Sequence, residues 1–234
     1  MSGILFVVST PIGNLADLSP RARDVLASAA VVACEDTRRT GRLLAHCGIK
    51  NRLLSLHEHN EASRVPSLVE RLAQGDDVAL VSDAGTPLLC DPGFLLVREA
   101  AARGVTVRAV PGPSAVLAAL AVSGLPPYPF TFGGFVPRKA GKRRTFFAGL
   151  ADLGHTSIAF ESPHRIQASL EAAAEVLDER PVVLCRELTK LHEEVLRGTA
   201  STIADHLEQR ASIKGEIVLV IGPPDGSGSR SPEA

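Results

Sequence analysis

Short apolar runs alternate with amphipathic stretches along the first 125 residues. The apolar runs are rich in Val, Leu and Ile, and they occupy 4–9, 31–34, 52–57, 78–82 and 105–110. The stretches that follow them repeat apolar residues at helical spacing, over 19–28, 38–47, 62–74, 93–103 and 114–122. Strands that alternate with helices are typical of a parallel sheet covered on both faces. The pattern predicts an α/β fold whose N-terminal domain, 1–125, is built on a five-stranded, mainly parallel sheet.

A proline-rich segment, 123–130, ends this alternation, because its three prolines and one glycine cannot continue a helix. Apolar runs and helical stretches resume beyond it, and the runs 182–187 and 193–199 are joined by a link as short as that of a hairpin. We therefore predict a second, C-terminal domain over 126–222 with a mixed α/β sheet. The last residues, 223–234, are rich in Pro, Gly and Ser and predict a disordered tail.

Composition narrows the class of protein only a little. Hydrophobic residues make up 45% and charged residues 22%, as is ordinary for a globular protein. No apolar run reaches the roughly 18 residues of a membrane span, and the N-terminus lacks the basic region of a signal peptide. Four cysteines without a CxxC pair predict reduced thiols and a cytoplasmic location. A net charge of −1 argues against a globally basic nucleic-acid binder.

Polar segments follow each of the five predicted N-terminal strands. They occupy 9–14, 35–38, 57–60, 82–87 and 111–114. In a parallel sheet all of them emerge at one edge, and open α/β sheets bind ligands just outside that edge. Any one of these segments could be an ordinary surface loop. Their coincidence predicts a reaction cleft at the carboxyl tips of the strands.

Two of these segments carry sharper chemistry. The loop 82–93, SDAGTPLLCDPG, combines two Asp, two Gly and two Pro. Glycine lets the backbone approach a ligand and proline fixes its path, so the loop is either a small-molecule cradle or a rigid surface turn. Ser114 stands where it could cap the helix that follows, and the free N–H groups there could either meet a carboxylate or simply be capped.

Other motifs are missing. The sequence has no glycine-rich dinucleotide fingerprint after the first strand, no P-loop and no nucleophile elbow. His57 and His59 lie two residues apart without further obvious ligands, so we expect no metal site.

A basic cluster lies near the start of the predicted second domain, beside glycines and a proline. It consists of Arg138, Lys139, Lys142, Arg143 and Arg144. Such a run is often just a solvated face. On a Gly/Pro loop at a domain entrance it is also suited to following a phosphate backbone.

Taken together and in order, these motifs resemble one family. The segments that carry the likeness are STPIGNLADLSPRA, CEDTRRT, SDAGTPLLCDPG, VPGPSA, SGLP, GFVPRK, ESPHR, RELTK and KGE. The chain closely resembles the small-subunit ribosomal RNA 2′-O-methyltransferase I family of the tetrapyrrole-methylase superfamily, from about Ile4 to Gly222. The resemblance implies a homodimer that uses S-adenosylmethionine, bound between the two domains. The implied product is a 2′-O-methylated cytidine in the decoding region of 16S rRNA.

The resemblance also implies site residues. The cofactor positions fall on Pro11, Asp83, Gly85, Thr86, Ser114, Ala115, Phe160 and Arg186. From its charge we expect the basic cluster to contact 16S rRNA, with the assembled small subunit as the expected partner and free rRNA as the open alternative. Cys90 departs from the small polar residue expected in relatives.

A ribose hydroxyl reacts poorly until it loses its proton, so a general base would help. The sequence leaves Glu35, Asp36, His57, Lys190 and Glu216 as candidates. We favour the segment that begins at Glu35, with Asp36 orienting or deprotonating the hydroxyl and Arg38 holding the RNA. Two other functions stay open: methylation of a small tetrapyrrole, and a non-catalytic RNA-binding role in subunit assembly.

Overall fold

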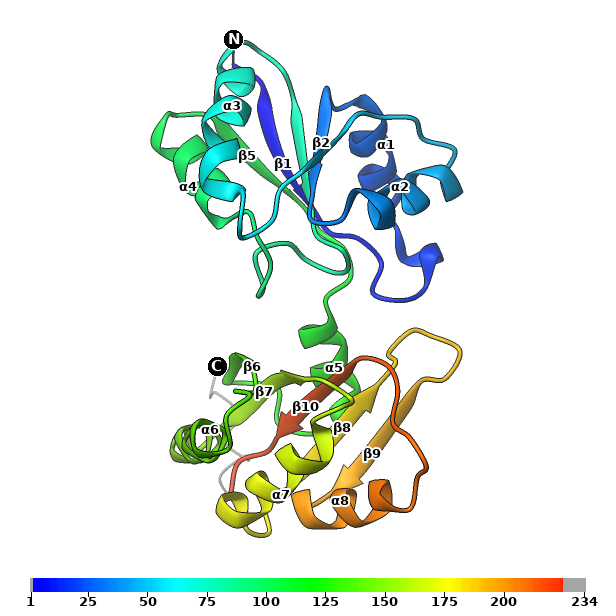
Figure 1. Ribbon diagram of the computed structural model, residues 1–234, viewed down its shortest axis with the longest axis vertical. Coiled ribbons are helices and arrows are strands. Elements are labelled where there is room, and N and C mark those ends of the chain that lie inside the picture. The colour runs from blue at the N-terminus through cyan, green and yellow to red at the C-terminus, as the bar shows by residue number, and fades with distance from the viewer. Residues whose placement is uncertain (1, 225–234) are drawn as a thin grey trace, which may run out of the picture. The chain divides into compact units, whose positions relative to one another are not determined.

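The computed structural model describes residues 2–224, and the chain divides into two compact units, Met1–Ser114 and Ala115–Ala234 (Figure 1). Almost all of the predicted tail at 223–234 therefore lies outside the described residues.

A parallel sheet forms the centre of the N-terminal unit. Its strands are β1 (Ile4–Val8), β2 (Val31–Cys34), β3 (Leu53–Ser55), β4 (Val78–Val81) and β5 (Thr106–Val110). They lie in the order β3-β2-β4-β1-β5, and every neighbouring pair is parallel. The helices between them are η1 (Leu15–Asp17), α1 (Pro20–Ser28), α2 (Thr37–His46), α3 (Glu61–Ala73) and α4 (Phe94–Ala102). The predicted five-stranded parallel sheet is confirmed.

Helices cover this sheet on both faces. The pair α3 and α4 lies on one side, and the pair α1 and α2 lies on the other (Figure 1). Alternate strand residues serve the two cores: Leu5 and Leu80 pack with α3 and α4, whereas Val8 and Val81 pack with α1 and α2. Because both faces are buried, the strands read as unbroken apolar runs in the sequence.

The C-terminal unit is a mixed sheet with its own core. Its strands are β6 (Phe130–Phe135), β7 (Thr156–Glu161), β8 (Val182–Arg186), β9 (Glu194–Gly198) and β10 (Ile217–Ile221), in the order β6-β7-β10-β8-β9. Its helices are α5 (Ala115–Ser123), α6 (Ala140–Asp152), α7 (Ile166–Leu177) and α8 (Ala200–Glu208). The β6–β7 pair is parallel, and the other pairs, including the predicted β8–β9 hairpin, are antiparallel.

The division between the units falls before α5, earlier than the boundary predicted after residue 125. Helix α5 packs against β10 and its neighbouring strands, and Arg197 on β9 donates hydrogen bonds to the carbonyls of Val122 and Ser123. An apolar helix must bury its surface, and the sheet that buries α5 is the second one. The proline-rich segment is thus a connection inside the C-terminal unit.

No helix in the stretch 2–224 has the length and apolar character needed to cross a membrane. The four cysteines are not paired in disulfides among residues 2–224, and Cys34, Cys47 and Cys185 are buried whereas Cys90 is exposed.

Candidate functional site

The segments that leave β1 and β4 are joined directly at the carboxyl edge of the N-terminal sheet. Thr10 and Gly85 form an antiparallel bridge, in which the Thr10 N–H donates to the Gly85 carbonyl at 2.9 Å and the Gly85 N–H donates back at 3.0 Å. Gly85 has φ of +77°, and a Cβ there would lie 3.2 Å from Cγ2 of Ile12. The loop therefore needs glycine at this position.

Thr86 ties three strand-tip segments together through one hydroxyl. Its Oγ1 donates to the Pro113 carbonyl at 3.1 Å and lies 3.0 Å from the hydroxyl of Ser9. Because a threonine hydroxyl has a single proton, Ser9 is then the donor of the second bond. Thr86, a predicted cofactor residue, thus joins the segments that follow β1, β4 and β5.

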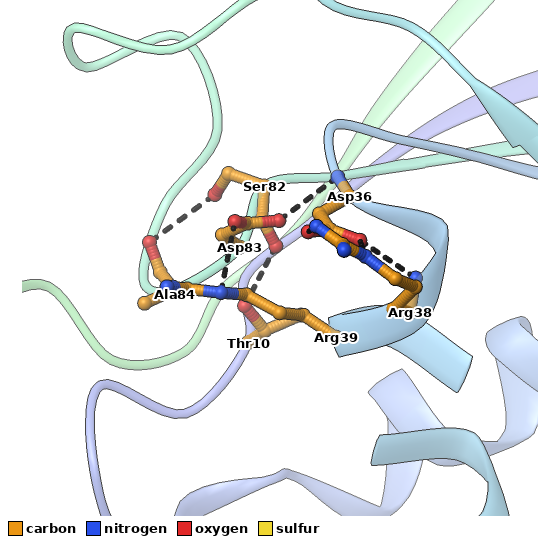
Figure 2. A network of polar contacts seen from close by, with 7 residues as sticks. All are labelled: Thr10, Asp36, Arg38, Arg39, Ser82, Asp83 and Ala84. Carbon is orange, nitrogen blue, oxygen red and sulfur yellow. Dashed lines mark hydrogen bonds and ion pairs between the residues drawn. The ribbon is translucent and has the colours of Figure 1, made fainter. Parts of the chain in front are cut away.

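Asp83 connects the loop after β4 to the segment after β2 (Figure 2). Its Oδ1 accepts the backbone N–H of Asp36 at 3.0 Å, and its Oδ2 lies 3.4 Å from Nε of Arg39. Nearby, the Thr10 hydroxyl donates to the Ser82 carbonyl at 3.3 Å, and the Ser82 hydroxyl donates to the Ala84 carbonyl at 3.2 Å (Figure 2). The start of the loop 82–93 is therefore hydrogen-bonded both to the segment after β1 and to the segment after β2.

Asp36 is the N-cap residue of helix α2 and pairs with Arg38. Its Oδ1 accepts the Arg38 backbone N–H at 2.8 Å, and its Oδ2 lies 2.7 Å from Nη2 of Arg38 (Figure 2). The hydrogen bonds from the Arg38 side chain and backbone hold the pKa of Asp36 well below its usual range. A carboxylate this weakly basic, with both oxygens already bonded, is a poor proton acceptor, so the geometry argues against the role we favoured for Asp36.

The pKa of Glu35 is shifted in the opposite direction from that of Asp36. It follows the last residue of β2 and is half-buried. Burial raises the pKa of Glu35, and the nearby carboxylates of Asp83 and Asp91 raise it further, against the effect of Arg39. A raised pKa makes this carboxylate a better proton acceptor than Asp36.

The far end of the loop 82–93 is anchored by a buried carboxylate. Oε1 of Glu61 accepts the backbone N–H groups of Gly93 at 3.0 Å, Leu95 at 2.8 Å and Leu96 at 3.4 Å. It thereby caps helix α4, whose first N–H groups have no partner within the helix. Gly93 has φ of +117°, and a Cβ there would lie 2.6 Å from Leu80, so this end also requires glycine. The sequence did not indicate that Glu61 caps α4, because a glutamate is an ordinary first residue for helix α3.

The remaining candidate bases lie in different surroundings. Lys190 donates to Glu187 at 2.7 Å and to Glu216 at 3.1 Å. Burial opposes the charged form of Lys190, but these hydrogen bonds outweigh burial and raise its pKa, which keeps it protonated. His57 has a buried Nδ1 without a hydrogen-bond partner in the described chain, and its Nε2 lies 3.1 Å from Asn60.

Three predicted cofactor residues belong to the C-terminal unit, the first being Ala115 at the start of α5. Phe160 on β7 packs edge-on against Phe132 and Phe135, with ring centroids 4.8 and 5.3 Å away. Arg186 at the end of β8 donates to Glu194 at 2.9 Å and to the Lys214 carbonyl at 3.1 Å.

The guanidinium of Arg186 shares its carboxylate partner with a second arginine. Arg210 donates to both oxygens of Glu194, at 2.6 and 2.8 Å. The Arg210 bonds, with those of Arg186, lower the pKa of Glu194 to about 2 against the effect of burial. Arg186 is thus already engaged within its own sheet.

The basic cluster is not uniform. Arg143 is 7% exposed and donates to the carbonyls of Arg138 at 3.1 Å and Ala168 at 3.0 Å, so it joins the loop before α6 to α7 and is not open to a phosphate. Arg144 is exposed and pairs with Glu175 at 2.9 Å. Arg138, Lys139 and Lys142 are exposed. The structure therefore removes Arg143 from the predicted RNA contacts.

Metal ligands do not gather anywhere among residues 2–224: no group of three His, Cys, Asp or Glu side chains there is arranged to hold an ion.

Comparison with known proteins identifies the family to which this chain belongs. The profile of the family described as Tetrapyrrole (Corrin/Porphyrin) Methylases matches residues 5–204, so the chain belongs to the tetrapyrrole methylase family. Solved structures agree in fold: a diphthine synthase has a TM-score of 0.72 at 18% identity, covering 95% of this chain and 90% of its own. A uroporphyrin-III-C-methyltransferase from Thermus thermophilus has a TM-score of 0.63 at 21% identity, covering 94% of each chain.

Closer relatives place the chain within that family. A protein of Xylella fastidiosa (strain Temecula1) is 50% identical over 94% of this chain and 81% of its own length, and one of Mesorhizobium japonicum is 50% identical over 94% and 75%. A third, of Haemophilus influenzae, is 44% identical over 100% and 84%. Each is named ribosomal RNA small subunit methyltransferase I, and the chain belongs to this branch, as the resemblance predicted.

Proposed function

We propose that this protein transfers a methyl group from S-adenosylmethionine to small-subunit ribosomal RNA, on the 2′-hydroxyl of a cytidine in the decoding region. The observation that carries the proposal is that two relatives named ribosomal RNA small subunit methyltransferase I are 50% identical over 94% of this chain. The coarser activity, methyl transfer, follows from the family. A cytoplasmic location and a homodimer accompany the proposal as predictions.

The strand-tip residues fit a methyl donor. S-adenosylmethionine, when bound, supplies a methyl group on a positively charged sulfur. Burial and the carboxylates of Asp83 and Asp91 raise the pKa of Glu35, and burial and the carboxylate of Asp83 raise the pKa of Asp91. The negative potential of these neighbouring carboxylates suits a cation. Gly112 also approaches Ser9 so closely that a Cβ would lie 3.0 Å from the serine Cβ, which leaves backbone groups uncovered by side chains. We assign the donor to this edge, with Pro11, Gly85, Thr86, Ser114 and Ala115 as its contacts.

Glu35 is the residue that we assign to proton transfer. The ribose oxygen becomes nucleophilic as its proton moves to a carboxylate within hydrogen-bond reach. Glu35 combines a raised pKa with a position at the end of β2, beside the loop 82–93. Arg38 and Arg39 at the start of α2 expose 84% and 62% of their side chains, so cations are available next to Glu35 for an RNA phosphate.

The test is methyl transfer from a donor with a radiolabelled methyl group, offered free small-subunit rRNA, assembled small subunits and a precorrin. We expect label in RNA, with the higher rate on assembled subunits. A 2′-O-methyl group blocks alkaline cleavage at its own nucleotide, so the label should remain in an alkali-resistant dinucleotide that contains cytidine. Label in the precorrin would favour the tetrapyrrole alternative, and RNA binding without transfer would favour the assembly factor.

The exposed basic residues before and within α6 should govern how RNA binding depends on salt. Replacing Arg138, Lys139 and Lys142 by glutamine should lower the slope of log affinity against log salt by roughly 2, at about 0.7 per lost contact to single-stranded RNA. The measurement is RNA affinity at several salt concentrations, with cofactor affinity unchanged. The control replaces the exposed Arg21, Arg64 and Arg103 by glutamine. An equal loss of slope in both triple variants would mean that the basic cluster has no special part in RNA binding.

A further inference from the structure

The carboxylate of Asp83 makes two contacts with the segment after β2, although the two segments are far apart in the chain. It accepts the Asp36 N–H across a separation of 47 residues, and it pairs with Arg39 in the first turn of α2. Figure 2 shows Asp83 between its own loop on one side and the start of α2 on the other. Glu35 immediately precedes the residue whose N–H is held, so the position of its backbone depends on this contact.

We propose that Asp83 is a positioning residue, whose carboxylate holds the segment after β2 so that Glu35 meets the ribose hydroxyl in a productive geometry. This inference rests on the proposed function and deepens it. It differs from the role that the resemblance implies for Asp83, direct contact with the cofactor. Both oxygens of the side chain are already used within the protein, one by the Asp36 N–H and one by Arg39.

The inference can be tested through the pKa of Glu35, because Asp83 is one of the charged groups that shift it. Burial is the main cause of its raised pKa, Asp83 and Asp91 follow, Arg39 acts in the opposite direction, and Glu58 adds a small increase. Removing the charge of Asp83 takes away one cause of the increase and releases Arg39 from its partner. The pKa of Glu35 should therefore fall, and the acid limb of the rate profile should move to lower pH.

Two substitutions separate the charge of Asp83 from its hydrogen bond. Asp83→Asn removes the charge but keeps an oxygen that can accept the Asp36 N–H. Asp83→Ala removes both. Asp91→Asn is the matched control, since Asp91 also raises the pKa of Glu35, but its own side-chain hydrogen bond is with Ser82 in the loop 82–93.

The experiment combines two readouts on the full chain: the Glu35 titration by NMR of carboxyl-labelled glutamate without substrate, and kcat against pH with saturating donor and rRNA. We expect all three variants to lower the pKa of Glu35. The plateau kcat should fall roughly 100-fold in Asp83→Ala, the effect of misplacing a reacting group by about 1 Å, and much less in the two asparagine variants.

Two outcomes would overturn the inference. One is an unchanged Glu35 titration in Asp83→Asn. The other is an Asp83→Ala protein with wild-type plateau kcat and a raised KM for the donor alone, which would make Asp83 a cofactor ligand. Failure of the proposed function is distinguishable, because it would appear as absence of transfer in the wild-type protein while the titration remained measurable. A circular dichroism spectrum like that of the wild type excludes misfolding of Asp83→Ala.

Discussion

Replacing Glu35 by glutamine should lower kcat for methyl transfer by about 10²–10⁴-fold, the usual contribution of a general base. Glutamine keeps the size of the side chain and its ability to accept hydrogen bonds but cannot take up a proton at neutral pH. Donor affinity should change little, because the loss lies in proton transfer and not in binding. The measurement is single-turnover transfer to rRNA, with donor affinity determined by calorimetry.

The pH profile provides a second check on Glu35. The active form is the carboxylate, and burial and neighbouring carboxylates raise its pKa above the ordinary value. Activity should therefore fall as the pH drops through this raised pKa, at a higher pH than for an unperturbed glutamate. In Glu35→Gln the residual activity should lack this limb.

Asp36→Asn is the matched control for Glu35. Asparagine caps a helix about as well as aspartate, so α2 should still begin at Thr37. We expect its kcat to remain within about tenfold of the wild type. If Asp36→Asn lost as much activity as Glu35→Gln, proton transfer would belong to Asp36 and the assignment made from the structure would be overturned.

Replacing Glu61 by leucine should destabilise the N-terminal unit by about 2–4 kcal/mol. The substitution leaves the N–H groups of Gly93, Leu95 and Leu96 without their acceptor, in a place where Glu61 itself is only 7% exposed. Hydrogen bonds to a charged group contribute about 1.5–3 kcal/mol, and buried donors left unpaired cost more than exposed ones. The measurement is urea unfolding followed by circular dichroism.

Glu99→Leu, on the helix α4 that Glu61 caps, is the control for Glu61→Leu. Glu99 pairs with Arg103 at the surface, at 2.9 Å, and exposed pairs of this kind contribute below about 1 kcal/mol. Equal unfolding free energies for the two variants would mean that the cap on α4 contributes little. Because Gly93 ends the loop 82–93, we also expect Glu61→Leu to weaken donor binding.

Much of the architecture could be read from the sequence because it depends on local patterns. Apolar runs of four to six residues between helical repeats define the strands of the N-terminal sheet, and the structure confirms them and their parallel arrangement. The polar segments at the strand ends follow from the same reasoning, since parallel strands bring their carboxyl ends to one edge. The contacts between Thr10 and Gly85, and between Ser9 and Thr86, show that two of these segments lie together.

Other features depended on partners far away in the chain, which no local pattern reveals. Helix α5 belongs to the second unit because the second sheet buries it. Arg143 looked like its neighbours in the basic cluster, but carbonyls of other segments take up its guanidinium.

The candidate site shows the same division most clearly. The sequence by itself determined that carboxylates stand at the ends of β2 and β4, because residue order and strand direction suffice for that. Only the tertiary structure distinguished Glu35, because its burial and its neighbours Asp83 and Asp91 come from distant parts of the chain, whereas the partner of Asp36 is two residues away. Asp36 forms an ion pair with Arg38 that keeps it ionised, whereas Glu35 is half-buried beside Asp83 and Asp91. That difference decides which of the two adjacent carboxylates is the better proton acceptor.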